Sequence, residues 1–215
     1  MNVLMNTKPV ILIGNGGHAN VLVNILQMNN IDVIGCVSPK FVEDFPIPYL
    51  GTDDFIFKNY MPKETFLING IGSVGDMGNR KNAYLYYKRY GYTFLSVIHP
   101  SVILPVNCTL GEGVQLMAGA VIQPNVSIGE NTLINTSASI DHDCQIGAHV
   151  HIAPGTVLSG NVCVQDETHI GTSATVIQNI KIGTKCTIGA GSVVVKNISD
   201  RTLAIGTPAR EVRKK

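Results

Sequence analysis

The sequence has almost no net charge and no long apolar run. Its 215 residues carry a formal net charge of +1, so the charge balance provides no attraction to nucleic acid or to an anionic membrane surface. No apolar stretch reaches the roughly 18 residues that a membrane-spanning helix requires. We therefore expect no nucleic-acid partner, no membrane insertion, and a small molecule as the ligand.

The cysteines lack the spacing of a disulfide framework or of a zinc site. They form an odd, scattered set without a CxxC pair: Cys36, Cys108, Cys144, Cys163 and Cys186. The amino terminus, MNVLMNTKP, also lacks the charged-then-apolar layout of a signal peptide. Both absences predict reduced thiols and a cytoplasmic protein.

The second half of the chain is a six-residue repeat. An aliphatic residue returns at every sixth position through sixteen hexads without insertion or deletion. These positions are Leu104, Leu110, Leu116, Ile122, Ile128, Ile134, Ile140, Ile146, Ile152, Leu158, Val164, Ile170, Val176, Ile182, Ile188 and Val194. A unit this short cannot bury its own apolar face and is stable only when stacked on its neighbours. Six residues suit one side of a parallel β-helix, a short strand followed by a turn.

Glycine often follows the aliphatic position directly. The glycines at this place are Gly111, Gly129, Gly147, Gly171, Gly183 and Gly189. We expect them at corners of the β-helix, where the backbone needs a residue that tolerates positive φ.

The first half of the chain alternates predicted strands and helices. Strands are expected over 10–13, 31–37, 65–68 and 92–98, with helices after residue 18, over 52–57 and from Gly78. Short loops between such elements imply a small parallel sheet covered on both faces. The sequence therefore predicts a Rossmann-like α/β domain over 1–98 and an all-β domain over 99–215.

A glycine-rich turn follows the first predicted strand. Gly14-Asn15-Gly16-Gly17-His18-Ala19 has the spacing G-x-G-x-x-A, which fits either a phosphate-binding loop at a helix N-terminus or a plain strand-to-helix turn. A dinucleotide site would also place an acidic residue at the end of the second strand. The chain has Val37-Ser38-Pro39 there, which argues against NAD.

The glycine turn followed by hexad repeats resembles the hexapeptide-repeat sugar acyltransferases, whose β-helix is left-handed and three-sided. Nucleotide-4-amino-sugar N-acetyltransferases of the bacillosamine type and sialic acid O-acetyltransferases are the most similar members. The resemblance implies acetyl-CoA-dependent N-acetylation of the 4-amino group of a nucleotide-linked deoxyamino sugar, for bacterial surface glycans. O-acetylation of a sugar such as sialic acid and a non-catalytic β-helix binding protein remain alternatives.

The resemblance also assigns the acceptor site. The glycine turn and a second glycine-rich loop would hold the sugar nucleotide through Gly16, Gly17, His18, Gly70 and Gly72. Relatives usually carry an Asp pair at the end of the second strand, where this chain has Val37 and Ser38. The identity of the nucleotide is therefore left open.

His142 is the candidate general base. A neutral imidazole can take the proton of an attacking amine or hydroxyl near pH 7, and a neighbouring carboxylate can orient it. Asp143 is the partner that the resemblance favours, but adjacent strand residues point to opposite sides, so the pair must lie at a corner. Asp141 is the alternative partner, and a solvated surface histidine is the alternative to a catalytic one.

A metal site is not expected. His149, His151 and His169 could share an ion, but no cysteine or carboxylate completes the set. By resemblance, His151 would instead lie near the thioester carbonyl of acetyl-CoA and stabilise its oxyanion.

Four further residues are expected to bind acetyl-CoA. Small side chains and exposed backbone on later coils suit a long, thin ligand: Gly160, Thr172, Ala190 and Gly191. The segment 205–210 would frame the donor, cap the last coil, or both. Outward apolar residues such as Val121, Leu133 and Val157 favour a homotrimer. The resemblance implies that each of its three active sites is built from two chains.

Overall fold

The computed structural model describes residues 8–73 and 77–212, which form two compact units. Residues 8–72 and 78–100 belong to the first unit, and Ser73, Met77 and residues 101–212 belong to the second. The division lies close to the predicted boundary at residues 98 and 99, but it also assigns Ser73 and Met77 to the second unit. Residues 1–7, at the amino terminus considered above, lie outside the described residues.

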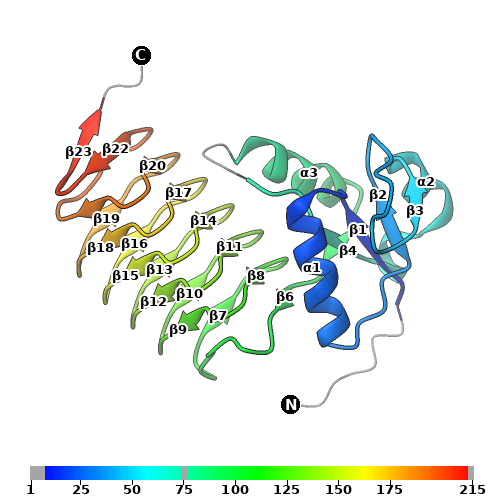
Figure 1. Ribbon diagram of the computed structural model, residues 1–215, viewed down its shortest axis with the longest axis horizontal. Coiled ribbons are helices and arrows are strands. Elements are labelled where there is room, and N and C mark those ends of the chain that lie inside the picture. Colours follow the sequence, from blue (N-terminus) through cyan, green and yellow to red (C-terminus); the bar gives the residue numbers. More distant parts are fainter. Residues whose placement is uncertain (1–7, 74–76, 213–215) are drawn as a thin grey trace. The chain divides into compact units, whose positions relative to one another are not determined.

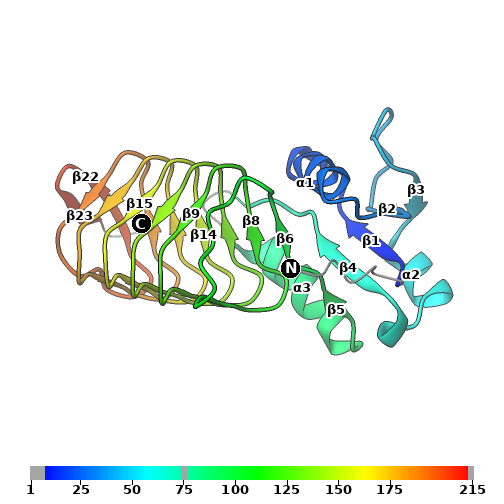
Figure 2. The same ribbon diagram turned by 90° about the horizontal axis from the view of Figure 1, so that it is seen from below.

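The first unit contains a five-stranded parallel sheet in the order β3-β2-β1-β4-β5, of which Figure 1 labels the first four strands and Figure 2 labels all five. Its strands are β1 (Val10–Ile13), β2 (Gly35–Val37), β3 (Tyr49–Gly51), β4 (Phe66–Asn69) and β5 (Thr93–Phe94). β2 is shorter than the predicted 31–37 strand, and β3 was not predicted because Pro46 and Pro48 mark its surroundings as a loop. The predicted strand over 92–98 is divided into β5 and β6 (Val97–Ile98).

Helices cover both faces of this sheet (Figure 2). α1 (Gly17–Met28) buries Leu22 and Leu26, whereas α2 (Asp53–Asn59) and α3 (Gly78–Arg89) bury Ile56, Tyr84 and Tyr87 in one cluster with Ile11 and Ile13. A short 3-10 helix, η1 (Pro62–Glu64), precedes β4. The chain runs from β1 outward to β3 and then returns to β4 on the other side of β1. Strand order thus reverses between β1 and β4, where parallel sheets bind ligands beyond the carboxyl ends of their strands.

The second unit is a parallel β-helix built from short strands on three sheets. The first sheet contains β7 (Thr109–Leu110), β10 (Ser127–Ile128), β13 (Gln145–Ile146), β16 (Cys163–Val164) and β19 (Lys181–Ile182). The second contains β8 (Gln115–Leu116), β11 (Leu133–Ile134), β14 (His151–Ile152), β17 (His169–Ile170), β20 (Thr187–Ile188), β22 (Leu203–Gly206) and β23 (Ala209–Val212). The third contains β9 (Val121–Ile122), β12 (Ser139–Ile140), β15 (Val157–Leu158), β18 (Thr175–Val176) and β21 (Val193–Val194).

The strand pairing shows how the hexads stack. Ile128 lies beside Leu110 and Ile146, so each strand pairs with the strand three hexads away. One coil therefore contains three hexads, as expected. Every repeat aliphatic from Leu116 to Val194 is buried in the interior, and Leu104 and Leu110 in the first coil are half-buried. Stacked aliphatic side chains form the core of the unit.

The explanation predicted for the repeat glycines is wrong. Positive φ occurs three residues after the aliphatic position, mostly at residues other than glycine, such as Asn125 and Asp143. The glycines directly after the aliphatic position have no positive φ. They allow neighbouring coils to approach: a Cβ at Gly129 would lie 2.5 Å from the carbonyl carbon of Gly147.

The carboxyl-terminal segment forms a β-hairpin. β22 pairs with β20 in parallel and with β23 in antiparallel orientation. This hairpin extends the second sheet past β20, which agrees with the capping interpretation of the segment 205–210. Within the described residues, none of the helices is long and apolar enough to cross a membrane.

Candidate active site

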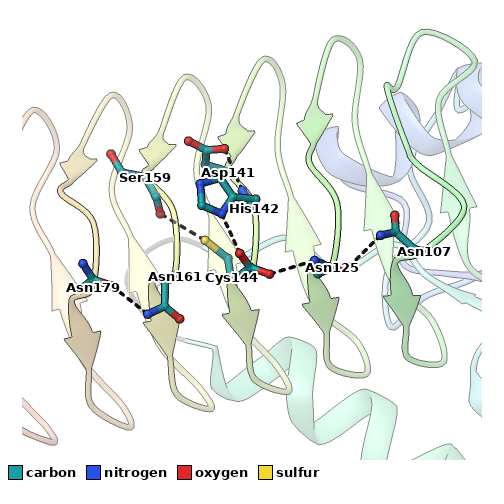
Figure 3. A network of polar contacts seen from close by, with 9 residues as sticks. Asn107, Asn125, Asp141, His142, Cys144, Ser159, Asn161 and Asn179 are labelled. Atoms are coloured by element: carbon teal, nitrogen blue, oxygen red, sulfur yellow. Dashed lines mark hydrogen bonds and ion pairs between the residues drawn. The ribbon is translucent and has the colours of Figure 1, made fainter.

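His142 and Asp143 form a hydrogen-bonded pair at one corner of the β-helix. Figure 3 labels His142 at this corner. The corner connects β12 on the third sheet with β13 on the first. Asp143 has a left-handed backbone (φ 61°), which turns its side chain to the same side as its neighbour. His142 Nδ1 lies 2.7 Å from Asp143 Oδ2, and Asp141 Oδ1 accepts a hydrogen bond from the backbone N–H of His142 at 2.8 Å. Asp143 therefore contacts the imidazole, and Asp141 contacts the backbone.

The pair has the electrostatics of an oriented base. The hydrogen bond to Asp143, followed by the charge of Asp141, raises the pKa of His142. The same hydrogen bond, followed by one from Asn125, lowers the pKa of Asp143, so its carboxylate stays ionised. Donation from Nδ1 to this carboxylate selects the tautomer with a lone pair on Nε2. The side chains are 59% and 49% exposed, so a substrate can reach them.

Gly160 provides the space that the imidazole occupies. A Cβ at this position would lie 2.7 Å from both Cε1 and Nε2 of His142. Gly160 is one coil further along the same corner. Its contact with the predicted base was not anticipated from the sequence, which suggested a place in the donor site.

The other predicted donor residues lie at a different corner. Thr172 connects β17 to β18, and Ala190 with Gly191 connects β20 to β21, so all three lie between the second and third sheets. All three are exposed, and Gly191 has φ 66°. The third sheet separates them from His142 within one chain, and their role in binding acetyl-CoA remains a prediction.

His151 lies on the second sheet and is buried. Its Nδ1 is 3.2 Å from Ser73 Oγ, and its Nε2 is 3.1 Å from Asn135 Nδ2. To donate a hydrogen bond to an oxyanion, the His151 ring would have to exchange one of these partners. Its role near the thioester carbonyl remains a prediction. Its ring also contacts His169, with centroids 4.9 Å apart. Among the described residues, no group of three or more His, Cys, Asp or Glu side chains is placed to hold a metal.

The first unit contains a cavity of about 830 Å³ at the carboxyl ends of β1, β2 and β4. The cavity is lined by all five residues predicted for the acceptor site: Gly16, Gly17, His18, Gly70 and Gly72. The structure adds Asn15, Ser38, Asp53, Tyr86 and Arg89 to the lining. This volume suits a small-molecule ligand. The cavity brings the predicted residues together, and their role in binding remains a prediction.

Two glycine loops line this cavity, and the one that contains Gly70 is closely packed. A Cβ at Gly70 would lie 2.7 Å from the carbonyl oxygen of Ile13 and 2.9 Å from Ala19 Cβ. The buried Arg80 holds the same loop, because its Nη1 donates to the carbonyl oxygens of Asn69 and Ile71 at 3.0 and 2.9 Å. Burial lowers the pKa of Arg80 to about 9. Arg80 was not singled out in the sequence, since arginine is a common residue of exposed helix faces.

The outward apolar residues do not form one patch. Val121 and Val157 lie on the third sheet and are half-buried and exposed, respectively. Leu133 lies on the second sheet and is buried. Only the third sheet therefore presents the predicted apolar surface.

A β-helix of hexapeptide repeats with an oriented histidine at its corner defines an acyltransferase of the hexapeptide class. Residues 107–138 and 125–160 match the family described as bacterial transferase hexapeptide (six repeats), and residues 9–85 match the PglD N-terminal domain. The chain belongs to the hexapeptide-repeat sugar acetyltransferases that carry this N-terminal domain. The predicted fold class, an α/β domain followed by a left-handed β-helix, is confirmed.

Solved structures resemble the chain over nearly its whole length. PerB from Caulobacter crescentus, in complex with CoA and GDP-perosamine, is 33% identical with a TM-score of 0.85, over 96% of this chain and 98% of that chain. The acetyltransferase domain of PglB from Neisseria gonorrhoeae is 30% identical with a TM-score of 0.86, over 96% and 100%. WeeI from Acinetobacter baumannii shares the fold at 21% identity, with a TM-score of 0.82 over 96% and 100%.

Proposed function

We propose that this protein transfers an acetyl group from acetyl-CoA to the 4-amino group of a nucleotide-linked deoxyamino sugar, for bacterial surface glycans. The observation that carries the proposal is the 2.7 Å contact between His142 Nδ1 and Asp143 Oδ2 on an exposed corner of the β-helix. PerB binds CoA and GDP-perosamine, and the PglB domain binds acetyl coenzyme A. Two further structures of a perosamine N-acetyltransferase from Caulobacter crescentus carry alanine or asparagine in place of one histidine, in complex with CoA and GDP-perosamine.

In the proposed reaction, Nε2 of His142 accepts the proton that the amine loses. A C–N bond forms as the amine attacks the thioester carbonyl, and the C–S bond breaks when the tetrahedral intermediate collapses. The imidazolium can then return the proton to the departing thiolate, so protons balance over one turnover. Asp143 holds the ring in the required tautomer and stabilises the imidazolium as it forms.

The cavity of the first unit supports a nucleotide-linked acceptor. A Cβ at Gly16 or Gly17 would meet no atom within 4 Å, so the backbone at the start of α1 is open to the cavity. Backbone N–H groups and the helix dipole at such a start favour a phosphate. Asp53 and Tyr86 line the same cavity with a hydrogen-bond acceptor and an aromatic ring, which suit the nucleobase of such a ligand.

A homotrimer would complete the site. His142 and the predicted donor residues Thr172, Ala190 and Gly191 lie at opposite edges of the third sheet. In the proposed trimer, adjacent chains around a threefold axis would bring the two groups together in one reaction centre. The exposed Val157 supports the third sheet as the surface that pairs.

The protein is proposed to act in the cytoplasm. All five cysteines are free thiols in the structure, which suits a reducing compartment.

A ligand screen followed by an activity assay tests the reaction. We expect one of the UDP, dTDP, GDP or CMP sugars to raise Tm, because stabilisation grows with the logarithm of ligand concentration over Kd. The 4-amino form of that sugar should then be acetylated with release of CoA. A flat thermal response to all four nucleotides, together with acetylation of free sialic acid, would replace the proposal by O-acetylation. No CoA release with any acceptor would favour a binding protein.

Mixed trimers test the shared site. His142→Ala and Thr172→Arg should each be inactive alone and regain partial activity when the two chains are refolded together. Gly160 cannot serve as the second position, because it contacts His142 in the same chain. A fully active monomer by light scattering at micromolar concentration would refute the shared site.

A further inference from the structure

Asparagine recurs once per coil at the corner that carries His142. The residues of this ladder are 18 apart: Asn107, Asn125, Asp143, Asn161 and Asn179. Asn107 Nδ2 donates to Asn125 Oδ1 at 2.7 Å, and Asn161 Nδ2 donates to Asn179 Oδ1 at 2.8 Å (Figure 3). The ladder connects neighbouring coils through side-chain amides.

The corner backbone explains the residue type. Asn125, Asp143, Asn161 and Asn179 have φ of 66°, 61°, 58° and 61°. Asparagine and aspartate enter this left-handed region more readily than other side chains. The left-handed backbone therefore explains why each coil has asparagine or aspartate at this corner. It does not explain why residue 143 is aspartate where the other four ladder residues are asparagine.

Asn125 donates to Asp143 in the same direction as Asn107 donates to Asn125. An ionised carboxylate has no proton to donate onward, so the side chain of Asp143 only accepts, from Asn125 and from its neighbour His142. Asn125 Nδ2 donates to its Oδ1 at 3.0 Å, while His142 Nδ1 lies 2.7 Å from its Oδ2. The two bonds use different oxygens of one carboxylate and so define the plane in which it lies.

We propose that Asn125 is a positioning residue of the active site, which holds the Asp143 carboxylate so that Oδ2 faces His142. Rotation of a carboxylate about its last bond meets only broad minima, and water competes for the half-exposed oxygens of Asp143. The amide of Asn125, held in turn by Asn107, removes this freedom. The inference rests on the proposed function, because it concerns the base of that reaction.

Two variants at Asn125 separate positioning from folding. Asn125→Gly tolerates the positive φ and removes the amide. Asn125→Asp keeps the shape and replaces the donor by an acceptor, and Asp143 shows that aspartate fits this corner. Asn179→Gly is the matched control, since it removes a ladder bond at φ 61° without touching Asp143 or His142.

Steady-state kinetics and NMR titration of the His142 ring supply the readouts. We expect kcat to fall about tenfold in Asn125→Gly, the order expected when a hydrogen bond to a charged group is exchanged for water, with both KM values unchanged. The kcat of Asn125→Asp should fall at least as far. Because the bond to Asp143 is the main cause of the raised pKa of His142, that pKa should drop in Asn125→Gly. The carboxylate of Asp141 also faces this region and is unaltered in all variants.

The outcomes distinguish this inference from the proposed function. Wild-type kcat and an unchanged His142 titration in Asn125→Gly would overturn the positioning role, as would an equal loss in Asn179→Gly. If the wild-type protein acetylates none of the nucleotide sugars, the proposed function fails. The His142 titration in the free protein still decides whether Asn125 holds Asp143.

Discussion

Gly160 offers a way to move the predicted base without removing it. In Gly160→Ala, the new Cβ would lie 2.7 Å from Nε2 and Cε1 of His142, where ordinary contacts begin at 3.4 Å. The ring must therefore shift by about 0.7 Å to restore an ordinary contact, judged from those two distances. Misplacement on the scale of 1 Å can cost about 100-fold in rate. We expect kcat to fall between about 10-fold and 100-fold.

The same substitution should leave stability almost unchanged. Gly160 has no positive φ, and the group it displaces is the end of a flexible side chain that is 59% exposed. A change in unfolding free energy within about 0.5 kcal/mol is expected for such a site.

Gly129→Ala is the contrasting control. Its Cβ would lie 2.5 Å from the carbonyl carbon of Gly147 and 2.6 Å from the backbone nitrogen of Ala148, which cannot swing away. Overpacking of this kind costs about 1–3 kcal/mol, which lowers Tm by roughly 2–4 °C per kcal/mol in a chain of this size.

Thermal melts and acetyl-transfer kinetics on the two variants provide the assay. The expected pattern is a slow, stable Gly160→Ala and a destabilised Gly129→Ala with near-normal kcat below its Tm. Full activity in Gly160→Ala would show that the position of the His142 ring does not limit the reaction, and the assignment of His142 as the base would fail.

Three further predictions concern the base, its protonation and the fold. His142→Ala should lower kcat by about 10²–10⁴-fold, the usual effect of losing a general base, without a change in Tm; near-normal turnover at saturating substrate would refute the assignment. Because the base must be neutral and its pKa is raised above 6.5, kcat/KM should fall as pH drops through that raised pKa, and Asp143→Ala should move this acidic limb to lower pH; an unmoved limb in a pH–rate profile would contradict the coupling. Ile152→Ala, in the buried aliphatic stack, should lower the free energy of unfolding by about 2–5 kcal/mol in a denaturant titration. A decrease no larger than that of a surface substitution would contradict the burial of Ile152 in the core.

The sequence alone predicted the β-helix because its interior repeats with a strict period. An inward aliphatic at every sixth residue sets the length of each strand-and-turn unit, whereas the three-sided coil was implied by the family resemblance, and the structure shows the resulting 18-residue pairing. The asparagine ladder was also visible at the same spacing, at Asn107, Asn125, Asn161 and Asn179, but its polar residues could equally have been ordinary turn residues. β3 was missed because two nearby prolines outweighed a three-residue strand that depends on tertiary contacts, namely pairing with β2 and packing of Leu50 against the core.

Tertiary structure decided what the side chains of the site contact. Sequence chemistry identified His142 and two possible carboxylates, but only the left-handed backbone at Asp143 determines which carboxylate meets the imidazole. The space beneath the ring depends on Gly160, which is distant along the chain and adjacent only after one coil has closed. The predicted donor residues Thr172, Ala190 and Gly191 lie at another corner, and the three-sided coil separates them from His142. A periodic pattern determines the core because each residue there meets its equivalents, whereas a site joins unlike residues whose proximity depends on how the backbone turns.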